Sequence, residues 1–517
     1  MYSVVSTAIV RGIESIEVSV EADVSDGMPV FEMVGLLGSE VKEARERVKT
    51  ALRNSGCRIP AKRITVNLSP ADVRKSGASF DLPIAVAILS SLGMIKREKL
   101  SNMLVAGEVG LNGDVLPVEG ILPMVAEAKR RGISRCMVAA KNVQEASLIE
   151  GIKIYGMKNL RQVIRFLDGQ SEEEPCVEQE ITGRIETATG QRKEETAPDF
   201  AEINGQQFLK HACEVAVSGM HNLLMSGPPG AGKTMAAKRI AGILPPLTRE
   251  EQLEISKIYS VSGLLAERET LIERRPFRNP HHTISPQGLA GGGRYPKPGE
   301  ITLAHSGILF LDEMTEFDRS TLEVLRQPLE EKQISLVRLN GTYHYPADFL
   351  LVGAMNPCAC GYYPDRNKCR CTERQLRHYL SKLSQPLLDR MDICVEAPRL
   401  EYEELTGKGA RNETSKEIRE RVLRVHAIQK KRFQGTSIRY NSRIPSSLIE
   451  EYCPLGETQR QYMYHVYQRL ELSARAYHKV LKVARTLADM EESEKIEQRH
   501  LAEAVCYRSF DKKIWEG

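Results

Sequence analysis

A glycine-rich run of eight residues matches the phosphate-binding P-loop at every required position. It consists of Gly227, Pro228, Pro229, Gly230, Ala231, Gly232, Lys233 and Thr234. In such a loop the glycines let backbone N–H groups turn towards phosphate oxygens, a lysine reaches the β and γ phosphates, and a hydroxyl ligates Mg²⁺. A helix that begins at Lys233 would add the positive end of its dipole. The run therefore predicts a nucleoside triphosphate site.

Two adjacent carboxylates, Asp312 and Glu313, follow the uninterrupted apolar stretch 308–311. Such a stretch is typical of a buried parallel strand that delivers polar side chains to a site. We expect Asp312 to hold Mg²⁺ through water and Glu313 to polarise the water that attacks the γ phosphate. A chance glycine-rich turn and an ordinary strand with a polar end are the alternatives, which the two motifs together disfavour. ATP hydrolysis is the predicted reaction.

Four cysteines lie close together in the sequence and could bind a metal. They are Cys358, Cys360, Cys369 and Cys371. Four thiolates suit tetrahedral zinc, although the CxC spacing is tighter than the usual CxxC. Two coincidental CxC pairs or a redox-active disulfide are the alternatives, and a reducing cytosol argues against a permanent bridge. We expect a structural Zn²⁺ in a four-cysteine insert at 358–371.

The elements that must position these residues fall into four stretches. Residues 1–170 alternate strand-like and helical runs, which indicates an α+β or α/β domain. Residues 171–199 are acidic and polar, as expected of a flexible linker. Residues 200–397 alternate strands and helices around the P-loop, as a nucleotide-binding parallel sheet requires. Residues 398–517 are predicted to form a helical lid.

Several individual elements can be predicted from the pattern of apolar residues. The expected strands of the first stretch are 15–21, 63–68, 103–108 and 136–139, and its expected helices are 41–55 and 81–92. Long amphipathic helices are expected at 415–433 and 459–489. Alternation around the pair Asn340-Gly341 predicts a β-hairpin with strands at 333–338 and 342–345.

Bulk composition excludes little. The chain has 72 Lys plus Arg against 68 Asp plus Glu, a net charge of +4, so a nucleic-acid surface would have to be local. No apolar run approaches the roughly 20 residues of a membrane helix, and the first residues lack the pattern of a signal peptide. A cytoplasmic protein without membrane partners is expected.

Six further motifs resemble a known family, the AAA+ ATPases related to the magnesium-chelatase I subunit and, within them, the ComM/YifB group. They are RPFRNPHHT at 275–283, GGG at 291–293, PGE at 298–300, LDE at 311–313, NPC at 356–358 and PLLDRMD at 386–392. The resemblance spans essentially the whole chain. It implies an α/β AAA+ P-loop core with a helical C-terminal lid, preceded by a Lon-protease-like (ribosomal protein S5 domain 2-like) α+β domain.

The resemblance also implies roles for single residues. Asn356 is similar to sensor 1, which helps to place the attacking water; a strand-end cap is the alternative. Arg390 resembles the arginine finger that one subunit inserts into its neighbour's ATP site, although it could instead pair with an adjacent aspartate. Arg475 resembles sensor 2, which contacts the γ phosphate, and Arg485 on the same predicted helix competes for that role. A finger donated in trans implies a ring, which in this family is a homo-hexamer.

The function implied by the resemblance is a hexameric helicase that drives branch migration of DNA during homologous recombination in natural transformation. Ring ATPases of this branch point a hairpin into the pore, where Lys332 and Arg338 could meet phosphates. Tyr343 and Tyr345 could stack on bases or pack on the domain. The adjacent His281 and His282 are a poor metal pair, and we interpret them as loop residues that face substrate, pack or remain solvated.

Two other functions remain open at this stage. One is an ATP-dependent metal-chelatase subunit, which would lack the first domain and the four-cysteine insert. The other is an ATP-dependent protease or unfoldase. Lon uses a serine and lysine pair; Ser76 and Ser79 lie near the expected serine, but Leu122 takes the place of the lysine, which makes proteolysis doubtful.

Overall fold

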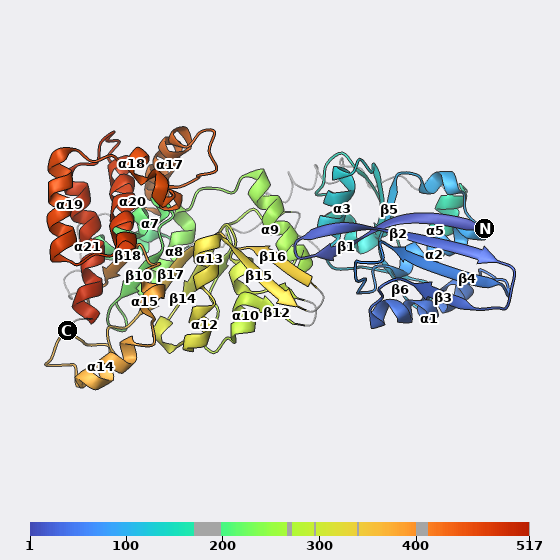
Figure 1. Cartoon of the computed structure of the whole chain (residues 1–517), viewed down its shortest axis with the longest axis horizontal. Helices are drawn as coiled ribbons and strands as arrows, with labels where there is room; N and C mark the ends of the chain where they lie inside the picture. The colour runs from blue at the N-terminus through green and yellow to red at the C-terminus, as the bar shows by residue number, and fades with distance from the viewer. Residues whose placement is uncertain (170–197, 266–270, 294–295, 339–340, 400–411, 516–517) are drawn as a thin grey trace.

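The computed structural model describes residues 1–169, 198–265, 271–293, 296–338, 341–399 and 412–515 (Figure 1). The linker predicted at 171–199 lies almost wholly outside the described residues, and so does most of the predicted hairpin turn. The described chain is elongated, with the first domain at one end and the C-terminal helices at the other. Within the described residues, every helix is too short or too polar to span a bilayer.

Residues 1–169 form one mixed sheet of seven strands in the order β3-β4-β2-β1-β5-β8-β9. The strands are β1 (Tyr2–Arg11), β2 (Glu14–Ser25), β3 (Phe31–Val34), β4 (Arg63–Ser69), β5 (Met103–Val105), β8 (Arg135–Ala139) and β9 (Lys153–Met157). β1 and β2 pair antiparallel, whereas β1, β5, β8 and β9 run parallel. Buried residues alternate along most of β2, as expected of a strand with one covered face. The strands predicted at 15–21, 63–68 and 136–139 correspond to β2, β4 and β8, whereas the one predicted at 103–108 ends at Val105.

The helices of this domain cover the sheet. They are α1 (Ser39–Asn54), α2 (Asp81–Ser91), α3 (Ile121–Arg130), α4 (Val143–Ala146) and α5 (Leu160–Asp168), with a small ladder of β6 (Glu108–Val109) and β7 (Val115–Leu116). Every residue of α2 is buried, because it packs between β1, β2 and α1. A helix that is covered on all sides needs apolar residues all round, which α2 has. The two predicted helices correspond to α1 and α2.

The second sheet contains the P-loop strand. Its parallel strands follow the order β11-β14-β17-β10-β18. They are β10 (Leu223–Ser226), β11 (Phe277–Arg278), β14 (Ile308–Leu311), β17 (Leu350–Met355) and β18 (Ile393–Glu396). β10, β14 and β17 are buried at every residue, as expected of a sheet covered on both faces. Their carboxyl ends lie together, since Ser226 is paired with Met355 and Leu311 with Gly353.

Helices and short strands surround this sheet. The longer helices are α7 (Gln207–Gly219), α8 (Lys233–Ile243) and α9 (Arg249–Val261). The shorter ones are α10 (Pro286–Ala290), α11 (Glu300–Leu303), α12 (Arg319–Glu323), α13 (Arg326–Glu331), α14 (Glu373–Leu380) and α15 (Gln385–Leu388). β12 (Gly291–Gly292) pairs with β13 (Lys297–Pro298), and β15 (Gln333–Arg338) pairs with β16 (Gly341–Pro346). The predicted hairpin is therefore present.

The C-terminal region is helical, with α17 (Ser415–Arg432), α18 (Ile449–Tyr452), α19 (Glu457–Arg469), α20 (Ala474–Met490) and α21 (Gln498–Trp515). The single helix predicted at 459–489 is wrong: it is two helices, α19 and α20. The chain turns between them at Glu471, whose φ of 44° is left-handed, and Ser473 caps α20 by accepting a hydrogen bond from the N–H of Ala476. Apolar residues of α7 and α8 share one buried core with α17, α20 and α21.

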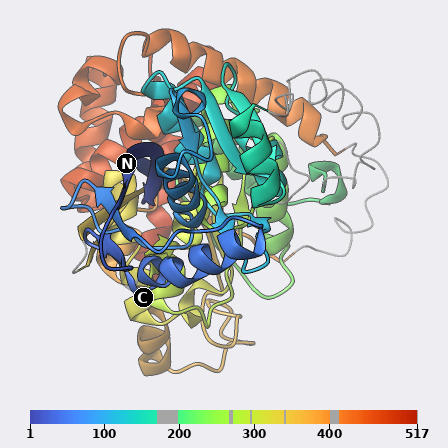
Figure 2. The same ribbon diagram turned by 90° about the vertical axis from the view of Figure 1, so that its right-hand side faces the viewer.

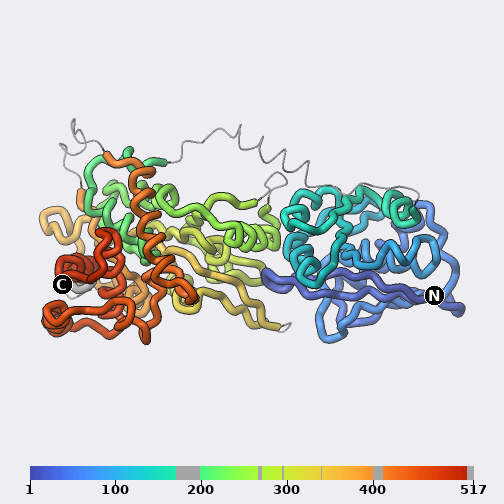
Figure 3. The backbone as a smooth tube through the Cα atoms, turned by 90° about the horizontal axis from the view of Figure 1, so that it is seen from above, coloured from blue at the N-terminus to red at the C-terminus, as the bar shows by residue number. Residues whose placement is uncertain are grey.

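The first domain packs against the core through α3 and α9, which lie side by side. Figures 2 and 3 show the first domain stacked on the end of the core that carries α9 and the hairpin β15–β16. The N–H of Gly120 donates to the carbonyl oxygen of Ser260, and the Ser260 hydroxyl donates to Oε1 of Glu145. Arg11, at the turn between β1 and β2, lies over the ring of Tyr343 on the hairpin. The hairpin therefore contacts both parts of the chain.

Candidate nucleotide site

The P-loop leaves β10 at Ser226 and enters α8 at Lys233, as predicted. Gly227 lies so close to Ala397, the residue after β18, that an added Cβ would be 2.2 Å from the carbonyl oxygen of Ala397. Gly230 and Gly232 have φ angles of 79° and 85°, in the left-handed region that glycine adopts without strain. Both properties explain why the turn needs glycine at these positions.

Lys233 lies under the P-loop. Its Nζ donates hydrogen bonds to the carbonyl oxygens of Gly227 (2.6 Å) and Pro228 (2.9 Å) and to Oδ1 of Asn356 (3.2 Å). All three acceptors are neutral. Burial lowers the pKa of Lys233, while the carboxylates of Asp312 and Glu313 oppose that shift. A buried ammonium on neutral acceptors gains a favourable partner when a phosphate enters, so this arrangement fits a nucleotide.

Thr234 and Asp312 are joined across the sheet. The Oγ1 of Thr234 donates a 2.9 Å hydrogen bond to Oδ2 of Asp312. Neighbouring ligands of an octahedral Mg²⁺, each about 2.1 Å from the metal, lie about 3 Å apart. The spacing of the two oxygens therefore fits two ligands of one Mg²⁺, with Asp312 as a direct ligand where the sequence predicted a contact through water. The sequence placed these residues in different motifs, and the parallel pairing of β14 and β17 beside β10 brings them together.

Glu313 projects from a strained turn. Its backbone is left-handed, with φ 50° and ψ 48°, and its side chain is 59% exposed. A non-glycine residue in this region costs about 1–2 kcal/mol, and such strain is concentrated at functional sites. Nδ1 of His282 lies 3.8 Å from Oε2 of Glu313. No motif in the sequence predicts this contact, which follows from the position of β11 beside β14.

Arg390 lies at the opposite end of the sheet from the P-loop. Asn222, which precedes β10, donates from Nδ2 to the carbonyl oxygen of Arg390 at 2.9 Å, and its N–H donates to Asp392 at 2.8 Å. The four residues of β10 therefore separate Arg390 from the P-loop by about 13 Å of strand. The guanidinium of Arg390 pairs with Glu330 at 2.5 Å. The alternative considered for Arg390, an ion pair with an adjacent aspartate, is not what the structure shows.

Arg475 lies beside Arg390 and not beside Lys233. Its Nη1 is 3.5 Å from the same Glu330 carboxylate, and its side chain is 65% exposed. Both arginines line a cavity of about 570 Å³ between the sheet and the C-terminal helices. The cavity also contains Lys479, which pairs with Asp392 at 2.8 Å. The structure thus places the predicted finger and the predicted sensor 2 together, at the amino end of β10.

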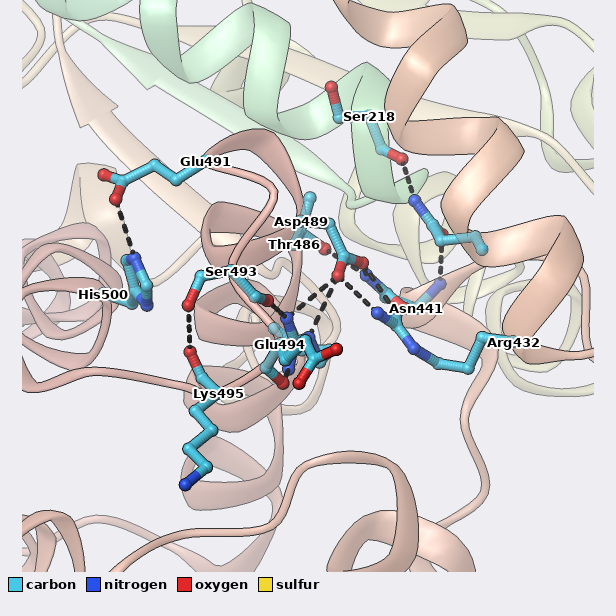
Figure 4. Close-up of polar contacts among 12 residues, drawn as sticks. Ser218, Arg432, Asn441, Thr486, Asp489, Glu491, Ser493, Glu494, Lys495 and His500 are labelled. Atoms are coloured by element: carbon cyan, nitrogen blue, oxygen red, sulfur yellow. Dashed lines mark hydrogen bonds and ion pairs between the residues drawn. The ribbon is translucent and has the colours of Figure 1, made fainter.

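Arg485, the competing residue, is 2% exposed and has a structural role. It pairs with Asp489 at 3.0 Å and donates to the carbonyl oxygens of Ser493 and Glu494. Figure 4 shows the surrounding network, in which Arg432 and Asn441 also donate to Asp489. The bond from Arg432 ties α17 to α20. All three side-chain nitrogens of Arg485 are engaged within the C-terminal region, on Asp489, Ser493 and Glu494.

The four cysteines are brought together as predicted. Their Sγ atoms all lie within 4.8 Å of one another, with Cys358 3.3 Å from Cys360 and 3.7 Å from Cys369. In a tetrahedral zinc site with Zn–S bonds of about 2.3 Å, the sulfur atoms are about 3.8 Å apart. Cys358 also accepts a hydrogen bond from the N–H of Tyr363. The donor set and its spacing fit one Zn²⁺.

Two of the residues predicted to contact DNA from the hairpin, Lys332 and Tyr345, have other contacts in the structure. Lys332 precedes β15, and its Nζ donates a hydrogen bond to the carbonyl oxygen of Leu329. The same Nζ lies 3.9 Å from Oδ1 of Asp348. Desolvation lowers the pKa of Lys332 to about 7. Its side chain is 24% exposed and lines the cavity of Arg390 and Arg475, so in this conformation it faces that cavity and not the far end of the hairpin. Tyr345 is 1% exposed and donates its hydroxyl to Pro296, so it packs on the domain. Arg338 is partly exposed at the far end of β15.

The first domain lacks the lysine that a Lon-type protease needs. Leu122 is fully buried in α3, and its N–H donates to Glu145. Ser79 is buried, and Ser76 lines a cavity of about 300 Å³ together with Glu119 and Lys297. Lys297 pairs with Glu119 at 2.8 Å. Among the described residues that line this cavity, the one lysine is therefore already engaged by a carboxylate.

Three family models match successive parts of the chain. They are "Subunit ChlI of Mg-chelatase" at 20–142, "Magnesium chelatase, subunit ChlI" at 199–405 and "Magnesium chelatase, subunit ChlI C-terminal" at 412–508. Competence protein ComM of Haemophilus influenzae is 41% identical over 501 residues, which cover 96% of each chain. Uncharacterized protein YifB of Salmonella typhimurium is 40% identical over 515 residues, 99% of this chain and 98% of the relative. Lon protease 2 of Bacillus subtilis is 31% identical over 128 residues, 24% of this chain and 22% of the relative.

Proposed function

This chain belongs to the ComM/YifB family of magnesium-chelatase-like AAA+ ATPases, and we propose that it forms a ring that uses ATP hydrolysis to move along DNA. The fold expected from the sequence, an AAA+ core with a helical lid behind a Lon-like first domain, is confirmed by this membership and by the two sheets. The observation that carries the proposal is the position of the candidate groups at opposite ends of β10.

At the carboxyl ends, the chain's own residues bind and orient the substrate. The P-loop amides and Lys233 hold the β and γ phosphates, and Thr234 and Asp312 hold Mg²⁺, which withdraws charge from the phosphate oxygens. Glu313 accepts a proton from the water that attacks the γ phosphorus, while the amide of Asn356 orients that water. The bond from the γ phosphorus to the β–γ bridging oxygen breaks, and ADP leaves with that oxygen.

At the amino ends, Arg390 and Arg475 serve the site of a neighbouring subunit. About 13 Å of strand separates them from the P-loop of their own chain, so neither can offset charge on its own nucleotide. A second copy that docks against the cavity beside Glu330 would place its phosphates near both guanidiniums. Each active site is then shared between two copies, which a closed ring satisfies for all of them. By analogy with the family we propose a homo-hexamer.

The proposed substrate of the ring is branched, single- or double-stranded DNA. A relative that covers nearly the whole chain is named a competence protein, which favours branch migration during homologous recombination in natural transformation. Arg338, at the end of β15, is the candidate phosphate contact. Lys332 would become one only if the contacts at the base of the hairpin opened.

We propose that the four cysteines hold one structural Zn²⁺, and that the protein is cytoplasmic. All ten described cysteines are free of disulfides, including four within bonding range of one metal. Reduced thiolates suit a reducing compartment, where ATP is also available.

ATP hydrolysis measured with and without forked or four-way DNA tests the function. We expect turnover to rise with protein concentration, as rings form, and to rise again with branched DNA. Insensitivity to both would contradict the ring and the motor. Stimulation by a porphyrin and Mg²⁺ would support a metal-chelatase subunit instead, and ATP-dependent loss of casein would support a protease or unfoldase despite Leu122.

A further inference from the structure

The four-cysteine loop begins inside the nucleotide site. Asn356 directly follows β17 and accepts the hydrogen bond from Lys233. Cys358 comes two residues later and is fully buried in the core that also contains Met355 at the end of β17. A metal ligand and the candidate water-positioning residue therefore lie on the same short, buried segment.

The loop also packs on the P-loop. The N–H of Gly361 donates to the carbonyl oxygen of Cys358 at 2.9 Å. This hydrogen bond closes a turn over residues 358–361, which contains the first two cysteines. Gly361 has a φ of 84°, and a Cβ at this position would lie 2.6 Å from Cδ of Pro229. The backbone of the cysteine turn is thus in contact with the proline ring of the P-loop.

A third contact reaches the turn that carries Glu313. After the last cysteine the chain enters α14, and Tyr379 of α14 accepts a 2.6 Å hydrogen bond from Oγ1 of Thr315. Thr315 lies two residues after Glu313 and is fully buried. The insert therefore touches the P-loop and the segment of Asn356, and the helix that follows it touches the turn of Glu313.

We propose that the metal bound by the four cysteines braces these three parts of the nucleotide site, so that the affinity for ATP depends on the metal. This inference rests on the proposed ATP site. Four metal–sulfur bonds restrict the loop at both of its ends, because each CxC pair supplies two of them. Without the metal, the turn at Gly361 is free to move away from Pro229. Asn356 also loses the restraint that a metal-bound Cys358, two residues further along the chain, would impose on it.

Gly361→Ala separates the brace from metal binding. The added methyl group would press on Pro229 and would hold alanine in a left-handed conformation, but it removes no sulfur. We expect about one zinc per chain by elemental mass spectrometry and an ATP dissociation constant about tenfold higher in a titration with a fluorescent ATP analogue. Gly435→Ala is the matched control, since Gly435 has a φ of 82° with nothing within 4 Å of an added Cβ. It should bind ATP like the wild type.

Metal removal tests the same link from the other side. Cys360→Ser and Cys371→Ser change the two partly exposed ligands, and wild-type protein stripped by a chelator provides a third sample. We expect zinc loss and weaker ATP binding in all three, with restored affinity when Zn²⁺ is added back to the stripped wild type. Circular dichroism checks that each sample remains folded.

The possible outcomes separate the two proposals. Stripped wild-type protein that binds ATP with unchanged affinity, or purified wild-type protein without metal that binds ATP fully, overturns the brace and leaves the ATPase proposal intact. Wild-type protein that contains zinc but binds no ATP overturns the proposed function and the brace with it.

Discussion

The two ends of the parallel core sheet differ in what they complete within one chain. At the carboxyl ends of β10, β14 and β17, Lys233 contacts Asn356, and Thr234 contacts Asp312, at distances of 2.9–3.2 Å. At the amino ends, Arg390 and Arg475 share Glu330 beside an open cavity. The first end is ready for a nucleotide, whereas the second has charged groups without a phosphate site in its own chain. This difference is the basis of our proposal that a second copy completes each site.

The largest expected effect comes from the carboxyl end. Lys233→Ala removes the buried ammonium that would meet the β and γ phosphates, so we expect ATP binding to fall by at least about a hundredfold in a nucleotide titration. Lys238→Ala, an exposed position on the same helix, is the matched control. Normal ATP affinity in Lys233→Ala would contradict the assignment of this end of the sheet.

A smaller but decisive effect joins the two ends. Glu313→Gln and Arg390→Ala should each keep ATP binding and lower kcat by about 10³-fold, because one loses the base and the other the charge supplied by a neighbour. A mixture of the two variants should recover part of the activity, at interfaces where an intact glutamate faces an intact arginine. Full turnover by Arg390→Ala alone would show that the arginine is not a finger.

Arg475 and Arg485 sharpen the contrast within one helix. Arg475→Ala should lower kcat by about tenfold with little change in melting temperature, since its side chain is exposed. Arg485→Ala leaves the buried Asp489 with one ion-pair partner fewer, so we expect a loss of roughly 3 kcal/mol in the free energy of unfolding. Thermal denaturation and steady-state ATP hydrolysis on both proteins separate these outcomes.

The smallest effect concerns DNA. Arg338→Ala should weaken DNA binding modestly and reduce the salt dependence of the logarithm of the binding constant by about one. Lys332→Ala should leave that slope unchanged, because the ammonium of Lys332 donates to the carbonyl oxygen of Leu329 and faces the cavity at the base of the hairpin. Fluorescence anisotropy at several salt concentrations measures the DNA-binding constant of both variants and its salt dependence. Equal slopes for Arg338→Ala and the wild type would contradict a phosphate contact at Arg338.

Features confined to a few consecutive residues could be predicted from the sequence. The P-loop, the strand before Asp312, the hairpin around Gly341 and the cluster of four cysteines all depend on local spacing and local backbone preference, and the structure contains each of them. The prediction of one continuous helix across Leu470–Ser473 was wrong, because it too relied on local spacing. The apolar period continues on both sides of the turn, so the break between α19 and α20 is visible only in the folded chain.

Residue types at short, fixed spacing were enough to identify the family, the phosphate-binding loop, the carboxylates and the thiols. The folded arrangement was needed to show that Arg390 and Arg475 lie together at the amino end of β10 and that Lys332 lines the cavity beside them. It was also needed to show that Arg485 is buried in an ion-pair network, that His282 lies beside Glu313, and that Gly361 contacts Pro229. These contacts join residues up to 132 positions apart. Strand order and helix packing bring such residues together, and neither can be read from local spacing.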